Sequence, residues 1–354
     1  MKKTIALLLS LVFIFALAAC GSSESGASSI IDTKKDVEYT YSSDTVQEVS
    51  DYEMLADVTN EKRWKIGWST TALDESNVIS YEGMKQGAEE LGVDLVVTSA
   101  ENMVDKQISD IESLIEQKCD VIILKALDRD ALSQVCGQAR AAGIKVVITG
   151  MPVNTEEFDL LIVSDQAMCA KNQADYINKL LEDNPDLSLK IGYLWGNTGF
   201  SGIELRYRGF VDNLNYDTGR VEIISEQIAN FNENEAIACT ENWMQQYGDV
   251  MNCIVAQSDA MALGAVEAVR GAGKSLDDFY ILGVDGTTGA IESIGKGELK
   301  MTVYTDLYKA GLYSIQQAVD LLNNPEKYVE TKTFSSGNMF VALTQDNLDE
   351  VLNK

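Results

Sequence analysis

The chain has 354 residues, with 28 Lys and Arg, 55 Asp and Glu and no His, so its formal net charge is −27. Without His there is no Ser-His-Asp or Cys-His catalytic unit, no HExxH zinc site and no two-His iron site. The negative charge disfavours a nucleic-acid partner, because phosphate binding needs basic patches, and the length predicts about two domains.

The first segment, residues 1–19, predicts an export signal. Two Lys precede an apolar run at residues 5–17, which is too short to favour a membrane-spanning helix. The residues before Cys20, Leu-Ala-Ala, resemble the end of a bacterial lipoprotein signal, in which the Cys receives lipid. We expect cleavage before Cys20, which removes the two Lys and leaves a net charge of −29, and a lipid anchor on a membrane surface. The alternative is an ordinary signal with a chance Cys.

Residues 20–60 predict a flexible tether. They begin with small polar residues and continue as an acidic stretch with few apolar residues, which cannot bury a core. A helical turn near 52–58 is the one element that we expect there. The tether gives the folded body reach from the membrane, and its sequence indicates no further role.

The remaining Cys residues predict buried free thiols. Five Cys follow Cys20, an odd number, so at least one has no partner within the chain, and none forms a CxxC pair. Most of them lie in predicted helices or at strand starts beside apolar residues, which is typical of structural thiols. Whether any of them are paired stays open at this point.

From residue 64 onward, short apolar strands alternate with amphipathic helices. The first run predicts strands at 64–69, 94–98, 121–124, 145–149 and 160–163, with helices at 78–91, 104–117 and 130–143 between them. The second predicts strands at 190–194, 221–227, 253–257, 280–284 and 301–304, with helices at 201–214, 233–247, 259–271 and 307–322. A further helix, capped by Asp165, joins the two runs, and Asp259 is a second predicted cap. This alternation predicts an α/β fold of two doubly wound lobes with parallel sheets.

Two such lobes side by side place a cleft between them. Ligands of open parallel sheets bind outside the carboxyl ends of the strands. The loops that we expect at the cleft are 69–77, 125–128, 150–153 and 195–204, together with positions 231, 258, 285–287 and 305–306.

Motifs for nucleotides and metals fail on inspection, so we expect neither cofactor nor metal. The stretch 273–275 has the Gly-Lys-Ser of a P-loop, but Ala268 replaces the required Gly and a helix precedes it. Asn and Glu at 230–241 have spacing like an EF-hand, but Glu235 replaces the central Gly. An exported glycosidase that uses two carboxylates stays as a minor alternative, although no acid pair is singled out.

Three segments resemble the sugar-binding components of ABC importers, the type I periplasmic-binding-protein family. AQSDAMALGA at 256–265 resembles their QNDxMALGA segment, ILGVDGT at 281–287 resembles VGFDGT, and IVSD at 162–165 resembles their ASD hinge crossing. The resemblance runs from about residue 64 to about residue 343. Lac-repressor-like regulators share this fold, but the export signal and the lack of a helix-turn-helix exclude that branch.

The family implies two lobes joined by a three-strand hinge, which close on the ligand. By resemblance, the N-terminal lobe comprises 61–165 and 306–333. The C-terminal lobe comprises 166–305 and 334–354.

Several candidate ligand-binding residues carry over from the family. Asp285 matches an aspartate that accepts hydrogen bonds from sugar hydroxyls, and Phe231 matches an aromatic residue that packs on the sugar ring. Asn77 and Tyr81 lie in the first loop, where the family uses Asn and aromatic residues. Trp195 ends a strand at the expected cleft. The alternatives are a turn cap for Asp285 and core or rim packing for Phe231 and Trp195.

Other candidate positions depart from the ribose-binding pattern. Met151 replaces an Arg, Glu204 replaces a site arginine although Arg206 and Arg208 are close by, Ser258 replaces an Asn, Thr305 replaces a Gln, and Lys125 stands where Asn is common. Ribose is therefore disfavoured, while a polyhydroxylated ligand still fits. Glu204 also permits an amine on that ligand.

These observations predict an extracytoplasmic, lipid-anchored solute-binding protein that is not an enzyme. We expect a monomer that captures a sugar or polyol between its lobes and delivers it to the membrane subunits of an ABC permease. The alternative is a ligand sensor whose closed form signals to a membrane receptor or histidine kinase. Both the identity of the solute and the choice between these partners stay open.

Overall fold

The computed structural model describes residues 46–48, 58–198, 200, 202–329, 333–335 and 340–352. The predicted signal at 1–19, Cys20 and most of the tether lie outside the described residues, as does the helical turn near 52–58 apart from Val58.

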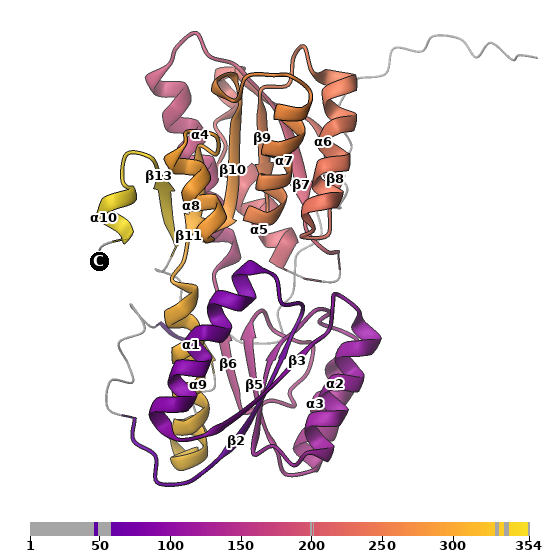
Figure 1. Cartoon of the computed structure of the whole chain (residues 1–354), viewed down its shortest axis with the longest axis vertical. Coiled ribbons are helices and arrows are strands. Elements are labelled where there is room, and N and C mark those ends of the chain that lie inside the picture. Colours follow the sequence, from indigo (N-terminus) through magenta and orange to yellow (C-terminus); the bar gives the residue numbers. More distant parts are fainter. Residues whose placement is uncertain are drawn as a thin grey trace, which may run out of the picture.

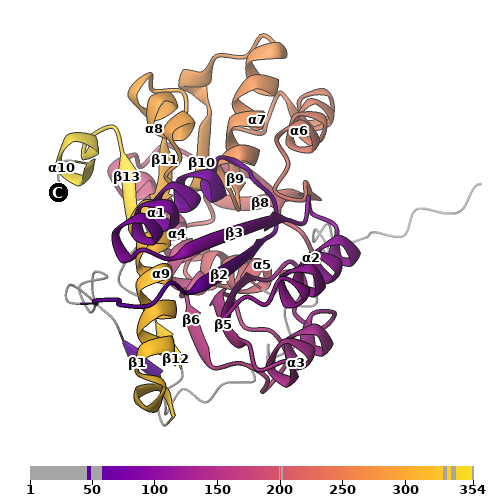
Figure 2. The same cartoon turned by 60° about the horizontal axis from the view of Figure 1, so that its bottom comes forward.

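The N-terminal lobe is built on a parallel sheet. Its described strands run in the order β1-β12-β6-β5-β4-β2-β3. Their bounds are β1 Val46–Glu48, β2 Lys65–Thr70, β3 Asp94–Ser99, β4 Val121–Lys125, β5 Lys145–Gly150, β6 Leu160–Val163 and β12 Thr333–Ser335. The helices are α1 Glu75–Leu91, α2 Val104–Glu116, α3 Ser133–Ala141 and α9 Leu307–Asn323, followed by a 3₁₀ turn, η5 Pro325–Tyr328. Figure 2 shows α1 beside α9 on one face of the sheet, with α2 and α3 on the other.

The C-terminal lobe repeats this design. Its described strands run in the order β13-β11-β10-β9-β7-β8. Their bounds are β7 Leu189–Trp195, β8 Val221–Ile228, β9 Cys253–Ala256, β10 Tyr280–Asp285, β11 Met301–Tyr304 and β13 Val341–Thr344. Helices α4 Gln166–Asp183 and α5 Gly202–Val211 cover one face, while α6 Glu233–Tyr247, α7 Asp259–Gly271 and α8 Thr288–Gly295 cover the other. The short helix α10 Leu348–Leu352 follows β13, which pairs antiparallel with β11 at the sheet edge.

The chain changes lobes after β6, after β11 and after β12, and Figure 1 shows the lobes stacked along the long axis. Two details differ from the sequence prediction. Residues 334 and 335 pair with β6 in the N-terminal sheet, so the last crossing lies beyond the predicted boundary at 333. Residues 46–48, predicted as part of the flexible tether, form β1 and pair with β12.

The strand order explains where a ligand site forms. In each lobe the first strand of the run, β2 or β7, lies between the second and third strands, so the order reverses direction beside it. Open α/β sheets bind ligands at such a reversal, outside the carboxyl ends of the strands. The central strands are largely buried and apolar, and a polar side chain can follow where such a strand ends; β4, for example, reads Val-Ile-Ile-Leu and then Lys125.

Helix caps hold the loops that leave these strands. Asp165 accepts the backbone N–H of Met168 at 2.9 Å and caps α4, as predicted. At α7 the predicted cap, Asp259, is instead the first helical residue, and the cap is Ser258, whose hydroxyl accepts the N–H of Met261. Asp259 is fully buried, and its carboxylate accepts hydrogen bonds from the loop that follows β10.

The five described Cys residues are all free thiols, and four of them are buried. Burial raises the pKa of the Cys136 thiol to about 12, so this thiol stays protonated and unreactive at neutral pH. The prediction of buried free thiols is confirmed for these four, and Cys239 is half-buried.

Candidate functional site

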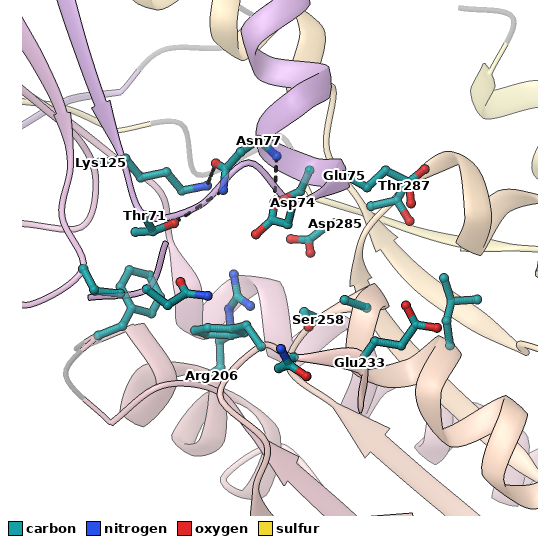
Figure 3. A pocket seen from close by; sticks show the side chains of 18 of the residues that line it. Thr71, Asp74, Glu75, Asn77, Lys125, Arg206, Glu233, Ser258, Asp285 and Thr287 are labelled. Carbon is teal, nitrogen blue, oxygen red and sulfur yellow. Dashed lines mark hydrogen bonds between the residues drawn. The ribbon is translucent and has the colours of Figure 1, made fainter. Parts of the chain in front are cut away.

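A cavity of about 380 Å³ lies between the two lobes. Its walls come from loops that follow β2, β3 and β4 in one lobe and β7, β8, β9 and β10 in the other (Figure 3). The polar lining residues are Thr71, Asp74, Glu75, Ser76, Asn77, Asn102, Lys125, Arg206, Asn232, Glu233, Ser258, Asp285 and Thr287. The apolar ones are Ala126, Leu127, Phe200, Phe231, Ala260 and Leu263.

The wall from the N-terminal lobe is organised by the start of α1. Asp74 caps this helix, because its Oδ1 accepts the backbone N–H of Asn77 at 2.9 Å. The buried Asn77 side chain then links two loops: its Oδ1 accepts Lys125 Nζ at 2.6 Å, and its Nδ2 donates to Thr71 Oγ1 at 3.4 Å (Figure 3). Lys125 is therefore held at the end of β4 with its ammonium at the cavity wall.

Asp285 ends β10 in the opposite wall, with a φ of 122°. This region is unfavourable for residues with a side chain, and such strain is typical of functional sites. The following loop is fixed by Asp259, whose Oδ2 accepts the N–H groups of Gly286 and Thr287, both at 2.8 Å. Thr302 donates its hydroxyl to the other Asp259 oxygen at 2.6 Å.

Burial raises the pKa of the Asp285 carboxyl, which is the largest influence on it. The positive charges of Arg206 and Lys125 act in the opposite direction, as does the backbone N–H of Asp259, and the negative charge of Asp74 raises the pKa further. The same burial raises the pKa of Asp259, where the neighbouring Asp285 adds to the effect. Charged side chains of both lobes therefore act on the Asp285 carboxyl: Lys125 and Asp74 from the N-terminal lobe, and Arg206 from its own lobe.

Arg206 supplies the guanidinium of the site from the first turns of α5. It is only 9 % exposed. Its Nε donates to Gln166 Oε1 at 2.7 Å, and its Nη1 donates to the backbone carbonyl of Gln257. Gln257 is itself fixed, because its side chain accepts the N–H of Gly196 and donates to Tyr193 and Ile203. This network orients the guanidinium before any ligand enters.

Two aromatic rings form the apolar wall. Phe200 and Phe231 meet edge to face, with ring centroids 5.9 Å apart, and the Arg206 guanidinium carbon lies 6.0 Å from the centre of the Phe231 ring. Phe231 has a φ of 57°, a second strained backbone in the cavity lining. A Cβ on Gly196 would lie 2.0 Å from this ring, so only glycine leaves room for it.

A hydrogen bond joins the two lobes at a residue of the cavity lining. Glu75, in the first turn of α1, accepts the backbone N–H of Gly289 at 3.1 Å with its Oε1. Gly289 lies in the first turn of α8, where unpaired N–H groups and the helix dipole favour a carboxylate.

Half of the predicted ligand-binding residues line the cavity. These are Asp285, Phe231, Asn77, Lys125 and Ser258. The other five, Tyr81, Met151, Trp195, Glu204 and Thr305, do not belong to its lining. Whether the residues of the first group contact a ligand stays a prediction.

The residues outside the lining have other environments. Trp195 is fully buried, stacks on Tyr207 with centroids 4.3 Å apart and donates its Nε1 to Glu226, which corresponds to the alternative of core packing. Tyr81 stacks on the buried Trp68, with ring centroids 6.2 Å apart, and Met151 is buried.

The cavity also contains residues that were not predicted. Arg206 takes the place assigned to Glu204, because the buried face of α5 includes positions 203, 206, 207 and 210. Asp74, Glu75 and Phe200 lie in loops that we expected at the cleft, but no motif distinguished them. Within the described part of the chain, no group of three or more Cys, Asp or Glu side chains is placed to hold a metal ion. None of the described helices is long and apolar enough to cross a membrane.

Comparison with known proteins identifies the class to which this fold and cleft belong. The model of the family described as "Periplasmic binding protein domain" matches residues 66–326, so the chain belongs to this family of solute-binding proteins. The family binds substrates and does not transform them, as expected from the sequence.

Two curated relatives show the level of similarity. The chain is 29 % identical over 265 residues to a ribose import binding protein of Bacillus subtilis, covering 75 % of this chain and 83 % of that protein. It is 31 % identical over 296 residues to a putative rhizopine-binding protein of Rhizobium meliloti, covering 82 % and 93 % of the two chains.

Among solved structures, the Caulobacter myo-inositol binding protein with myo-inositol bound is 25 % identical, with a TM-score of 0.73 over 83 % of this chain and 97 % of that chain. A galactofuranose binding protein, 20 % identical, shares the fold with a TM-score of 0.73 over 82 % of this chain and 98 % of that one. The type I fold predicted from the sequence is confirmed.

Proposed function

We propose that the protein captures a sugar or related polyol in the interlobe cavity and delivers it to an ABC importer. The observation that carries this proposal is the composition of the cavity. Hydrogen-bonding side chains from both lobes converge on a space of about 380 Å³, which falls within the range of small-molecule sites.

The chemistry of the lining suits a ring with many hydroxyl groups. The Asp285 carboxylate accepts hydrogen bonds from hydroxyls, Arg206 and Lys125 donate them, and Asn77 and Ser258 can do both. The Phe200 and Phe231 rings offer apolar faces to the C–H groups of such a ring.

Lobe closure provides the signal that an importer reads. A ligand that contacts both walls stabilises the closed arrangement, as in hinge-bending proteins generally. The Glu75 to Gly289 hydrogen bond then forms part of the closed surface. A protein of this kind acts as a monomer with one ligand site, and its lobes are 61–165 with 306–335 and 166–305 with 336–354.

Anchoring through Cys20 completes the proposal. The Leu-Ala-Ala-Cys sequence supports lipidation at Cys20, which would keep the binding lobes near the permease outside the cytoplasm. Incorporation of a labelled fatty acid into the expressed protein, and its loss in Cys20→Ser, would test the anchor. Labelling that persists in Cys20→Ser would contradict it.

The binding function is tested by a thermal-shift screen followed by calorimetry. The screen covers pentoses, hexoses, cyclitols and linear polyols, and a ligand that binds the folded state raises Tm by mass action. We expect at least one compound to raise Tm in the native protein and in Asp183→Asn, a matched substitution at an exposed ion pair outside the cavity lining. Asp285→Asn should weaken that response, and no response from any compound would contradict the proposal.

A further inference from the structure

Two carboxylates from opposite lobes face the same part of the cavity. Asp74 comes from the start of α1 and Asp285 from the end of β10, and Figure 3 shows both side chains directed into the space between the walls. Their charges interact, since Asp74 contributes to the raised pKa of Asp285.

The two cations of the cavity do not pair with these carboxylates. Lys125 donates to the neutral amide of Asn77, and Arg206 donates to Gln166 and to the carbonyl of Gln257. In the described ranges, neither Asp74 nor Asp285 forms an ion pair within 4.0 Å. The cations therefore act on Asp285 only at longer range.

The lining as a whole also carries excess negative charge. Four carboxylates, Asp74, Glu75, Glu233 and Asp285, face two cations, Lys125 and Arg206. Glu75 accepts the Gly289 N–H, and Glu233 is exposed. Asp74 accepts the Asn77 N–H and the Ser76 hydroxyl through its Oδ1 alone, so among the described residues its Oδ2 and the Asp285 carboxylate are available to a ligand.

Closing the lobes around this pair has an electrostatic consequence. Asp74 moves with one lobe and Asp285 with the other, so closure brings two negative charges together in a space with reduced access to water. Like charges in such a place destabilise each other, whereas a cation between them is attracted to both. A neutral hydroxyl donates a hydrogen bond but brings no compensating charge.

We propose that the preferred ligand is a polyol that carries a protonated amine, and that its ammonium group lies between Asp74 and Asp285. This inference rests on the proposed binding function and narrows its ligand class. The hydroxyls of the same ligand face Arg206, Asn77 and Ser258, and its apolar face lies against Phe231.

Matched ligand pairs test the inference directly. Calorimetry at pH 7 compares glucosamine with glucose, galactosamine with galactose, and an aminocyclitol with the corresponding inositol, so that each pair differs only in amine against hydroxyl. We expect the amine of at least one pair to bind at least about tenfold more tightly.

Substitution of each carboxylate by Asn removes charge and leaves the local structure in place. Asn is as good a helix cap as Asp, so Asp74→Asn keeps the cap of α1, and Asn has the same shape as Asp, so Asp285→Asn adds no bulk at the end of β10. In both variants the ratio of amine to hydroxyl affinity should fall at least about fivefold. Asp183→Asn, which removes a charge at an exposed ion pair outside the cavity lining, should leave the ratio unchanged.

The outcomes separate this inference from the binding function. Binding of neutral members with no preference for their amines would overturn the inference while the proposed function stands. An amine preference that survives in both Asp74→Asn and Asp285→Asn would also overturn it. If no member of any pair binds but another neutral sugar or polyol of the wider screen does, the inference is overturned and the proposed function stands. If nothing in the pairs or in the wider screen binds, both are overturned.

Discussion

Asp285 has a strained backbone and a carboxyl removed from water, and its carboxyl makes the stability of the protein depend on pH. Its carboxyl has a raised pKa in the folded chain, so the folded state binds this proton more tightly than the unfolded state does. A group of this kind contributes stability that is complete below the unfolded pKa of about 4 and is lost as pH rises through the folded pKa. The charged groups that face it are Arg206, Lys125, Asp74 and Asp259.

We therefore predict a pH effect on the unliganded protein. The Tm of the native chain, measured against that of Asp285→Asn, should fall as pH rises from about 4 to neutrality. Differential scanning calorimetry of both proteins in the same buffers measures this difference. A difference in Tm that stays constant across that pH range, or grows with pH, would show that the Asp285 pKa is not raised.

Arg206 is the second residue with a specific prediction. Its planar guanidinium reaches Gln166 and the Gln257 carbonyl together, and Lys has no fork with which to make both contacts. Arg206→Lys should therefore lower the affinity for the ligand found in the screen at least about tenfold, as calorimetry would measure. Arg63→Lys, at an exposed ion pair with Asp94, is the control and should leave affinity unchanged. Equal affinity in both variants would argue against Arg206 as a ligand-orienting group.

The site residues differ in how far the sequence alone reveals them. Asp285 and Ser258 belong to segments that resemble the family, so their strand ends could be located. The resemblance aligns Glu204 with a site arginine of the family, whereas Arg206 lines the cavity, because two residues along a helix rotate a side chain by about 200°. Asp74 is missed for another reason, because the length of the loop after β2 hides which residue caps α1.

The packing of α1 against α9 depends on two glycines at the helix crossing. A Cβ on Gly83 would lie 1.9 Å from the Tyr308 carbonyl oxygen, and a Cβ on Gly311 would lie 1.9 Å from that of Ser80. Backbone atoms cannot move aside as the end of a side chain can, so the helices would have to separate.

We predict that Gly83→Ala destabilises the protein by about 1–3 kcal/mol. Gly137→Ala in α3 is the matched control, since its Cβ has no neighbour closer than 3.7 Å. Alanine should stabilise that helix by about 0.5–1 kcal/mol. Urea denaturation of the two variants compares the free energies of unfolding. Similar values for both would mean that the helices are not in close contact.

Elements with a long periodic pattern are predictable from the sequence, and short ones are not. The central strands and long helices are visible because apolar residues recur at the spacing of a strand or a helix. β1, with three residues in an acidic stretch, has no such pattern and forms through pairing with β12. The predicted lobe boundary at 333 and the predicted cap of α7 differ from the structure by one or two residues, because local propensity does not resolve them.

At the scale of the whole molecule, the sequence predicts two lobes and a cleft but not the contacts between them. Such contacts join residues far apart in the chain, as Glu75 and Gly289 are, and leave no local pattern. The distribution of charge is also hidden in the sequence. The net charge of −27 can be counted, but the interaction of Asp74 with Asp285 depends on how the lobes face each other.

The Glu75 contact leads to a prediction about lobe closure. A hydrogen bond of this kind contributes about 0.5–1.5 kcal/mol, which corresponds to a change of about two- to tenfold in the ratio of closed to open forms. Glu75→Ala should shift the unliganded protein toward the open form and increase its radius of gyration in X-ray scattering. Glu89→Ala, an exposed substitution on the same helix away from the other lobe, should not.

Ligand binding provides the second measurement on this pair. If the bond belongs to the closed form, Glu75→Ala lowers ligand affinity by up to the same two- to tenfold factor, because binding must now also supply that part of the closure free energy. Glu75→Gln keeps an acceptor for the Gly289 N–H, so its ligand affinity should lie between those of the native protein and Glu75→Ala. A radius of gyration and an affinity that stay at native values in Glu75→Ala would show that closure depends on the cavity alone.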